Sequence, residues 1–170
     1  TPVALGSRRD EYVALLTSKT LLREYIERKN LMPILFEDMW DAANGRWKKQ
    51  DPSKVPKLCD GVDKLSKKVI HVQAAKSGLI RITAEWSDPQ LAAEWVNDLV
   101  KSVNEHVRVQ TIEDANRGME FLGRELKKAD TLTVREGIYR LQEANLNKQM
   151  LANVQEDYAL RTVDVAVPPH

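Results

Sequence analysis

Residues 87–130, SDPQLAAEWVNDLVKSVNEHVRVQTIEDANRGMEFLGRELKKAD, decide the fold of this chain. The opening Ser87-Asp88-Pro89 is typical of a helix start, because a serine or aspartate side chain caps the first turn and proline is tolerated there. No further proline interrupts the sequence up to Val167. The stretch predicts a helix of about 40 residues, roughly 60 Å long at 1.5 Å per residue, whereas the mean helix has about 11 to 12 residues.

One face of this helix is apolar at coiled-coil spacing. The residues of this seam are Ile112, Ala115, Met119, Leu122 and Leu126. A seam of this kind needs a partner, and a second helix is predicted after residues 129–131. This second helix also has an apolar face, although the polar residues Asn145 and Lys148 interrupt it. The apolar residues of this face are Val134, Ile138, Leu141, Ala152, Val154 and Tyr158.

Two β-strands are predicted before the long helix, because apolar and polar residues alternate over residues 70–74 and 80–86. Lys76-Ser77-Gly78 joins them into an antiparallel hairpin. Alternation returns over residues 159–167 and stops at Pro168-Pro169, which predicts a third strand that returns to the base.

The N-terminal third of the chain is less regular. Residues 8–29 have helical spacing and predict one helix with a possible break near Ser18. Pro33 forbids its continuation, and the tryptophan-bearing stretch that follows is interpreted as an ordered loop. Asp51-Pro52-Ser53 and Pro56 favour the start of a short helix that ends near Ser66.

Together these elements predict a single α+β domain. It has a small mixed α/β base and a long antiparallel helical hairpin arm, in the order strand, strand, long helix, helix, strand. The base comprises residues 1–100 and 156–170, and the arm comprises about residues 101–155.

Composition and motifs argue against several classes of function. With 26 basic and 25 acidic residues, the net charge of +1 disfavours nucleic-acid binding. We find no phosphate-binding glycine loop, nucleophile elbow or metal-binding helix motif, so we expect no catalytic residue, metal or cofactor. The only cysteine, Cys59, is expected to fill a small gap in the core. No apolar run approaches the length needed to cross a bilayer, and the chain is interpreted as an excised part of a longer protein.

Two segments resemble the Wzz-type chain-length determinants, also called polysaccharide co-polymerases. They are residues 87–100, SDPQLAAEWVNDLV, and residues 158–169, YALRTVDVAVPP. The hairpin adds further similar positions, and the resemblance covers most of residues 69–169. The similar positions in the hairpin are Leu122, Leu126, Arg135, Leu141 and residues 150–153, MLAN.

The resemblance implies a periplasmic domain anchored to the bacterial inner membrane by two transmembrane helices outside this sequence, the second just after Pro168 and Pro169. It further implies a ring-like homo-oligomer that performs no bond chemistry. This ring would act as a scaffold for a polysaccharide polymerase and regulate chain length in O-antigen, lipopolysaccharide or a related surface polysaccharide. Two alternatives remain open. One is the periplasmic part of a capsule or exopolysaccharide export protein linked to a tyrosine kinase, and the other is an unrelated coiled-coil adaptor.

The candidate contact residues are aromatic or basic. Trp40 and Trp47 are candidates for contact with a glycan or a neighbouring protomer, whereas Trp86 and Trp95 are expected in the core. Residues 46–68, with a local charge of 8 − 3 = +5, form either a solvated face or a contact for anionic lipid or a lipid-linked glycan. The basic residues of the arm form either a solvated face or, in a ring of protomers, intersubunit ion pairs or the lining of a lumen. They are Arg117, Arg124, Lys127, Lys128, Arg135 and Arg140.

Overall fold

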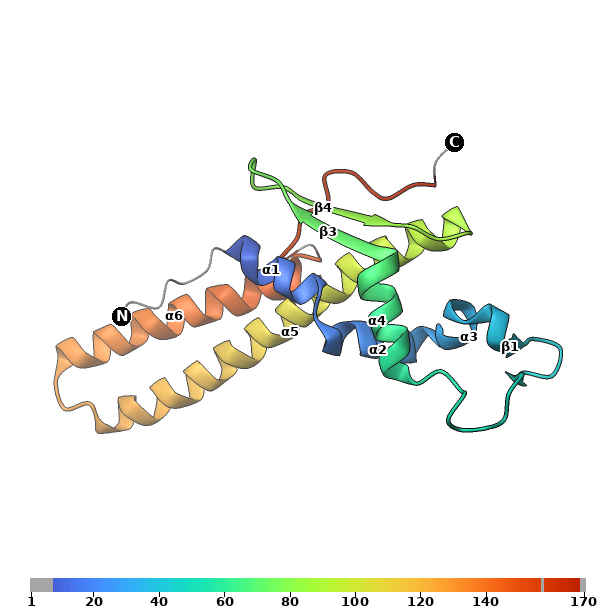
Figure 1. The fold of residues 1–170 in the computed structure, drawn as a ribbon. Coiled ribbons are helices and arrows are strands. Elements are labelled where there is room, and N and C mark those ends of the chain that lie inside the picture. The colour runs from blue at the N-terminus through green and yellow to red at the C-terminus, as the bar shows by residue number, and fades with distance from the viewer. Residues whose placement is uncertain (1–7, 157, 169–170) are drawn as a thin grey trace, which may run out of the picture. The chain divides into compact units, whose positions relative to one another are not determined.

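The computed structural model describes residues 8–156 and 158–168, and it shows a mixed α+β protein dominated by helices (Figure 1). The mutual contacts of the residues divide the chain into two compact units. Unit 1 runs up to Ser102 and includes the segment from Asp164 onward, and unit 2 is Val103–Val163. The long helix α5 (Pro89–Lys128) contributes to both units, and its length agrees with the prediction of about 40 residues.

The first helices of unit 1 are α1 (Arg8–Leu16) and α2 (Lys19–Lys29). The predicted break near Ser18 is confirmed, because Ser18 caps α2 and its side chain accepts a hydrogen bond from the Leu21 N–H. Asn30 ends α2 in the left-handed conformation, which asparagine tolerates better than most residues.

The loop predicted after α2 contains regular elements. They are the short helix α3 (Met32–Leu35), a 3₁₀ turn (Glu37–Met39) and a small hairpin of β1 (Trp40–Asp41) and β2 (Arg46–Trp47). Pro33 does not prevent helix formation, because it lies in the first turn of α3, where its missing N–H has no partner to lose. The later short helix is α4 (Leu58–Lys64), which continues into a π-helical turn (Leu65–Val69).

The core of unit 1 joins residues from α2, α4 and the first part of α5. Trp95 is 1% exposed and its ring lies 5.2 Å from the ring of Trp86, so Trp95 is a core residue as predicted and Trp86 is half-buried. Cys59 is exposed rather than buried, because α4 turns Gly61 and Val62 toward the core instead. The other fully buried side chains are Leu16, Leu22, Tyr25, Ile26, Leu35, Leu65, Val69 and Leu99.

A polar contact at the edge of this core gives a testable pH dependence. The hydroxyl of Tyr25 donates a hydrogen bond to Asp98 at 3.3 Å, and burial together with the charge of Asp98 raises the pKa of Tyr25. Unfolded tyrosine ionises near pH 10, so the unfolded state loses a proton that the folded state retains. Stability should therefore be unaffected by Tyr25 below about pH 10 and fall above it. A spectrophotometric titration at 295 nm should show a late phenolate phase that Tyr25→Phe lacks. An unchanged titration curve in that variant would contradict the assignment.

The predicted hairpin before α5 is confirmed. Strands β3 (Ile70–Ala74) and β4 (Ile80–Ala84) pair antiparallel, with Val72 opposite Ile82. Gly78 adopts φ +88° in the connection, a conformation that favours glycine.

The predicted third strand does not form within the described part of residues 159–167. The sheet stays two-stranded, and in unit 1 the backbone is paired with a side chain instead. Asn97 donates to the Ala166 carbonyl at 3.0 Å and accepts from the Ala166 N–H at 3.1 Å. A single asparagine thus satisfies the donor and the acceptor that a neighbouring strand would have satisfied.

In unit 2 the second part of α5 packs antiparallel to α6 (Leu132–Val154). Gln149 donates to Asn116 at 3.0 Å, and a side chain added at Gly118 would collide with Asn145. Nearer the connection, Leu122, Ala129 and Ile138 form a buried cluster with Leu126 packed against it. Of the predicted seam of α5, Leu122 and Leu126 therefore face α6.

The predicted seam of α6 is only partly right. Ile138 and Ala152 are buried, whereas Val134, Leu141 and Val154 are exposed. Polar side chains lie in the seam because the facing residues of α5 suit them. Gly118 leaves room for Asn145, and the Asn116 amide accepts the hydrogen bond of Gln149.

The end of unit 2 is held by Asn104, which is 3% exposed. Its side chain accepts from the N–H groups of Ala159 at 3.0 Å and Leu160 at 2.7 Å, and it donates to the Leu160 carbonyl at 3.0 Å. Asn97 and Asn104 are seven residues apart in α5. Each, within its own unit, binds the backbone of the C-terminal segment.

Candidate functional site

The two candidate tryptophans of the segment predicted as an ordered loop lie together. Trp40 and Trp47 face each other across the β1–β2 hairpin, with ring centroids 5.0 Å apart and planes at 78°. Both are half-buried, so each keeps part of its ring available to a ligand. The edge-to-face arrangement stabilises the pair and fixes the direction in which Trp47 presents its ring.

The turn of this hairpin is built by a carboxylate. Asp41 accepts hydrogen bonds from the Asn44 backbone N–H at 3.3 Å and from the Asn44 side chain at 2.7 Å. These bonds, the side-chain bond foremost, lower the pKa of Asp41. Gly45 has φ +61° and completes the turn.

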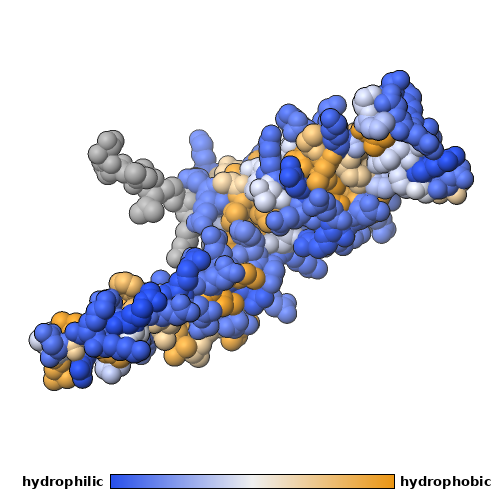
Figure 2. All heavy atoms as spheres, turned by 90° about the horizontal axis from the view of Figure 1, so that it is seen from below, coloured by the Kyte–Doolittle hydropathy of each residue, from blue (hydrophilic) through white to orange (hydrophobic). Residues whose placement is uncertain are grey.

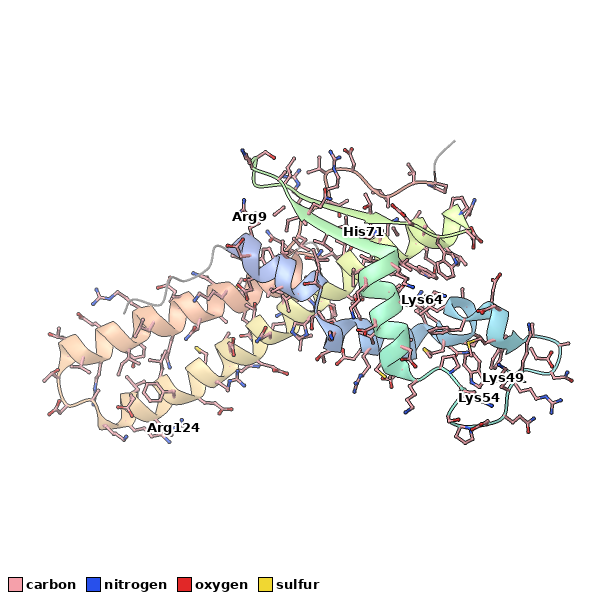
Figure 3. All side chains as sticks on the ribbon, in the orientation of Figure 1. Arg9, Lys49, Lys54, Lys64, His71 and Arg124 are labelled. Carbon is pink, nitrogen blue, oxygen red and sulfur yellow. The ribbon has the colours of Figure 1, made fainter. Side chains whose placement is uncertain are left out.

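A cavity of about 220 Å³ opens beside Trp47, and we call it the lysine pocket. Lys48 is fixed, since its ammonium group donates to the Asp38 carbonyl at 2.9 Å and its N–H donates to the Met39 carbonyl. Figure 3 shows Lys49 and Lys54 next to each other on the segment that follows β2. The residues that line the pocket are Asp38, Met39, Trp47, Lys48, Lys49, Lys54 and Pro56.

A second carboxylate turn, at residues 51–53, directly precedes Lys54 in the chain. Asp51 accepts from the Ser53 N–H at 3.0 Å and from the Ser53 hydroxyl at 2.7 Å, and these bonds lower its pKa. Lys54 lies 3.6 Å from the same carboxylate, and the side chains of both residues are about half exposed. An ion pair of this length in water is weak, so Lys54 can exchange it for a bound anion.

The remaining basic residues of segment 46–68 do not form one continuous charged face. Lys64 turns inward, where it donates to the Leu35 carbonyl and lies 4.8 Å from the ring centre of Phe36 and 5.5 Å from that of Trp86. Lys67 pairs with Asp63 at 3.0 Å. The lysine pocket is therefore the part of the segment that gathers positive charge around a hollow.

No family model, curated protein or solved structure matches this chain. The function must therefore be argued from its own side chains. In the described part of the chain, no helix combines the length and hydropathy that crossing a membrane requires. Nor do three or more metal-ligating side chains gather anywhere in that part.

The six basic residues proposed as contacts in unit 2 have different surroundings. Arg117 pairs with Asp114, and Lys128 pairs with Glu125 at 2.9 Å, each within α5. Arg135 donates to the Ala129 carbonyl at 3.1 Å, so it stabilises the connection between the helices. Arg124, Lys127 and Arg140 are exposed and take part in no ion pair found among the described residues.

Three of these basic residues share one side of α5 with an exposed aromatic ring. Arg117, Phe121, Arg124 and Lys128 are spaced four, three and four apart, which places them on one face. Phe121 is 54% exposed, and Figure 3 shows Arg124 on the side of α5 turned away from α6. We call these four residues the α5 outer stripe.

Helix α6 also has an apolar stripe that faces solvent. Leu132, Tyr139 and Leu146 recur every seven residues, and Met150 follows four residues later, all with 46–72% of their surface exposed. Glu136 and Glu143 stand four residues after Leu132 and Tyr139 and lie on the same side. We call these six residues the α6 outer stripe. Figure 2 views the molecule from below and shows hydrophobic atoms exposed among charged ones on the helical pair.

Sequence reasoning identified Trp40, Trp47 and the basic residues, but not the pocket or the α6 outer stripe. The seven-residue recurrence of Leu132, Tyr139 and Leu146 is visible in the sequence and was the available signal. Of the two prolines proposed as the membrane-proximal junction, Pro168 is half-buried and Pro169 lies outside the described residues.

Proposed function

We propose that this chain is a non-catalytic assembly module that regulates polysaccharide chain length. It would act as a ring-like homo-oligomer that holds a polysaccharide polymerase at the periplasmic face of the bacterial inner membrane, during synthesis of O-antigen, lipopolysaccharide or a related surface polysaccharide. The helical pair would serve as the arm of each protomer. The observation that carries this proposal is the α6 outer stripe, because a helix with a second apolar face is typical of one that packs against another chain.

The occupant that we propose for this stripe is the α5 outer stripe of a neighbouring copy. One surface carries Glu136 and Glu143 beside apolar side chains, and the other carries Arg124 beside Phe121. Arg117 and Lys128 of the second surface already pair with Asp114 and Glu125 within α5, so Arg124 is the basic residue set against the carboxylates. Complementary charge fixes the register of such a contact and disfavours other pairings. Because the two stripes differ, the contact is head-to-tail, and a head-to-tail contact generates a ring when its rotation closes.

A charge exchange tests this contact. Arg124→Glu and Glu143→Arg should each weaken association about ten-fold, equivalent to about 1.4 kcal/mol, because each sets like charges against each other across the interface. The double variant should restore association. Cross-linking and sedimentation would measure the oligomer, and the modal glycan length would be measured in cells whose native gene carries the same changes.

The control is Lys148→Glu, an equal charge reversal on an exposed residue of α6 that lies away from the stripe. It should leave assembly and glycan length unchanged. If the double variant associates no better than the single ones, the proposed contact is wrong. If assembly is lost without any change of glycan length, the contact stands and the role in chain length is wrong.

A further inference from the structure

We propose that the lysine pocket binds a phosphorylated monosaccharide, with the sugar ring against Trp47 and the phosphate among the lysines. The pocket lies in unit 1, and the observations that carry it are independent of the helical stripes. The proposed ligand is inferred from the residues of the pocket alone. Only the role of that ligand in polysaccharide assembly rests on the proposed function.

The charges of the pocket favour an anion. Three lysines line it together with Asp38, and a further carboxylate, that of Asp51, lies 3.6 Å from Lys54. Lys48 is held in place by the Asp38 carbonyl, and Lys49 and Lys54 are exposed and line the same pocket. Ammonium groups bind phosphate as compact charges with several donors, so these lysines suit a phosphate ester.

The other walls favour a sugar rather than phosphate alone. Trp47 offers an indole surface, and Met39 and Pro56 add apolar surface that a bare anion would leave unused. A sugar ring has an apolar face of C–H groups and an edge of hydroxyl groups. The Trp47 ring suits that face, and the Asp38 carboxylate can accept hydrogen bonds from the hydroxyls.

The volume of the pocket suits a single sugar ring. Its volume of about 220 Å³ is below the roughly 300–1,000 Å³ of pockets that enclose drug-sized ligands. The edge-on contact of Trp40 with Trp47 fixes the wall against which the ring would lie. A free sugar phosphate and a lipid-linked one share this chemistry, and the test must separate them.

Titration of the intact chain with glucose 1-phosphate, followed through tryptophan fluorescence and the indole N–H signals in NMR spectra, tests the proposal. Binding should be at least ten-fold tighter than that of inorganic phosphate or of glucose. The double variant Lys49→Ala/Lys54→Ala should bind roughly 25-fold more weakly, since each lysine near an anionic group contributes about a five-fold factor. The control Lys67→Ala/Lys68→Ala removes the same charge from the same segment outside the pocket and should bind normally.

Equal binding of inorganic phosphate and glucose 1-phosphate would overturn the proposal, because Trp47 would then contribute nothing. Phosphatidylglycerol vesicles provide the lipid arm, and tighter binding to them would mean a contact for a membrane surface instead. A loss of affinity in the Lys67/Lys68 control equal to that in the pocket variant would also overturn it. None of these outcomes affects the charge exchange between the helical stripes, so the two proposals fail separately.

Discussion

Replacing Trp95 by alanine is expected to cost unit 1 about 3–5 kcal/mol of unfolding free energy, the range seen for truncation of buried Phe and Trp. Trp95 is 1% exposed and packs on Trp86, so alanine leaves a large cavity and removes an aromatic contact. Domains of this kind are typically stable by only about 5–15 kcal/mol. The variant should therefore lose a large fraction of the stability of unit 1.

The measurement can separate the two units. All four tryptophans of the sequence, Trp40, Trp47, Trp86 and Trp95, belong to unit 1. Urea unfolding followed by tryptophan fluorescence therefore reports on unit 1, whereas circular dichroism at 222 nm reports on the helices of both units. In Trp95→Ala the fluorescence transition should move to lower urea more than the circular-dichroism transition does.

Trp40→Ala is the matched control, because it makes the same truncation at a half-buried ring in the β1–β2 hairpin. It should cost only about 1–2 kcal/mol, since less apolar surface is removed from a buried environment. Equal costs for the two variants would mean that Trp95 does not anchor the core.

Elements specified by neighbouring residues could be predicted from the sequence. The start of α5 follows from the side chain of Asp88, which accepts from the Gln90 N–H at 2.8 Å, and its length follows from the absence of further proline. The β3–β4 hairpin follows from alternation and a glycine turn. Each of these signals acts within a few residues.

Features that depend on distant partners could not be predicted in this way. Alternation over residues 159–167 is real, but it does not tell whether the backbone pairs with a strand or with Asn97 and Asn104. Helix α6 has more apolar residues than can pack against α5, so some of them are exposed. Asn145 fits between the helices because Gly118 lies opposite it. The lysine pocket brings Asp38 and Lys54 to one hollow, which no spacing along the chain indicates.

Replacing Asn104 by leucine should release the end of unit 2. Leucine has the same number of side-chain heavy atoms and the same branching. It would leave the N–H groups of Ala159 and Leu160 and the Leu160 carbonyl without the partner that Asn104 provides. A buried polar group without a partner costs about 1–3 kcal/mol. The free energy needed to open this segment should fall by about 3 kcal/mol. The two N–H groups should therefore exchange their hydrogens about 100-fold faster.

Asn104→Asp separates hydrogen bonding from packing. Aspartate keeps the acceptor for both N–H groups but loses the donor to the Leu160 carbonyl, so the amides of Ala159 and Leu160 should stay largely protected at neutral pH. Hydrogen exchange measured by NMR at these two amides gives the expected order Asn, Asp, Leu, from slowest to fastest. Slow exchange in the leucine variant would mean that the C-terminal segment is held by apolar contacts. Fast exchange in both variants would mean that the hydrogen bond donated to the Leu160 carbonyl is decisive. The segment would then need both the oxygen and the NH₂ group of the Asn104 side chain.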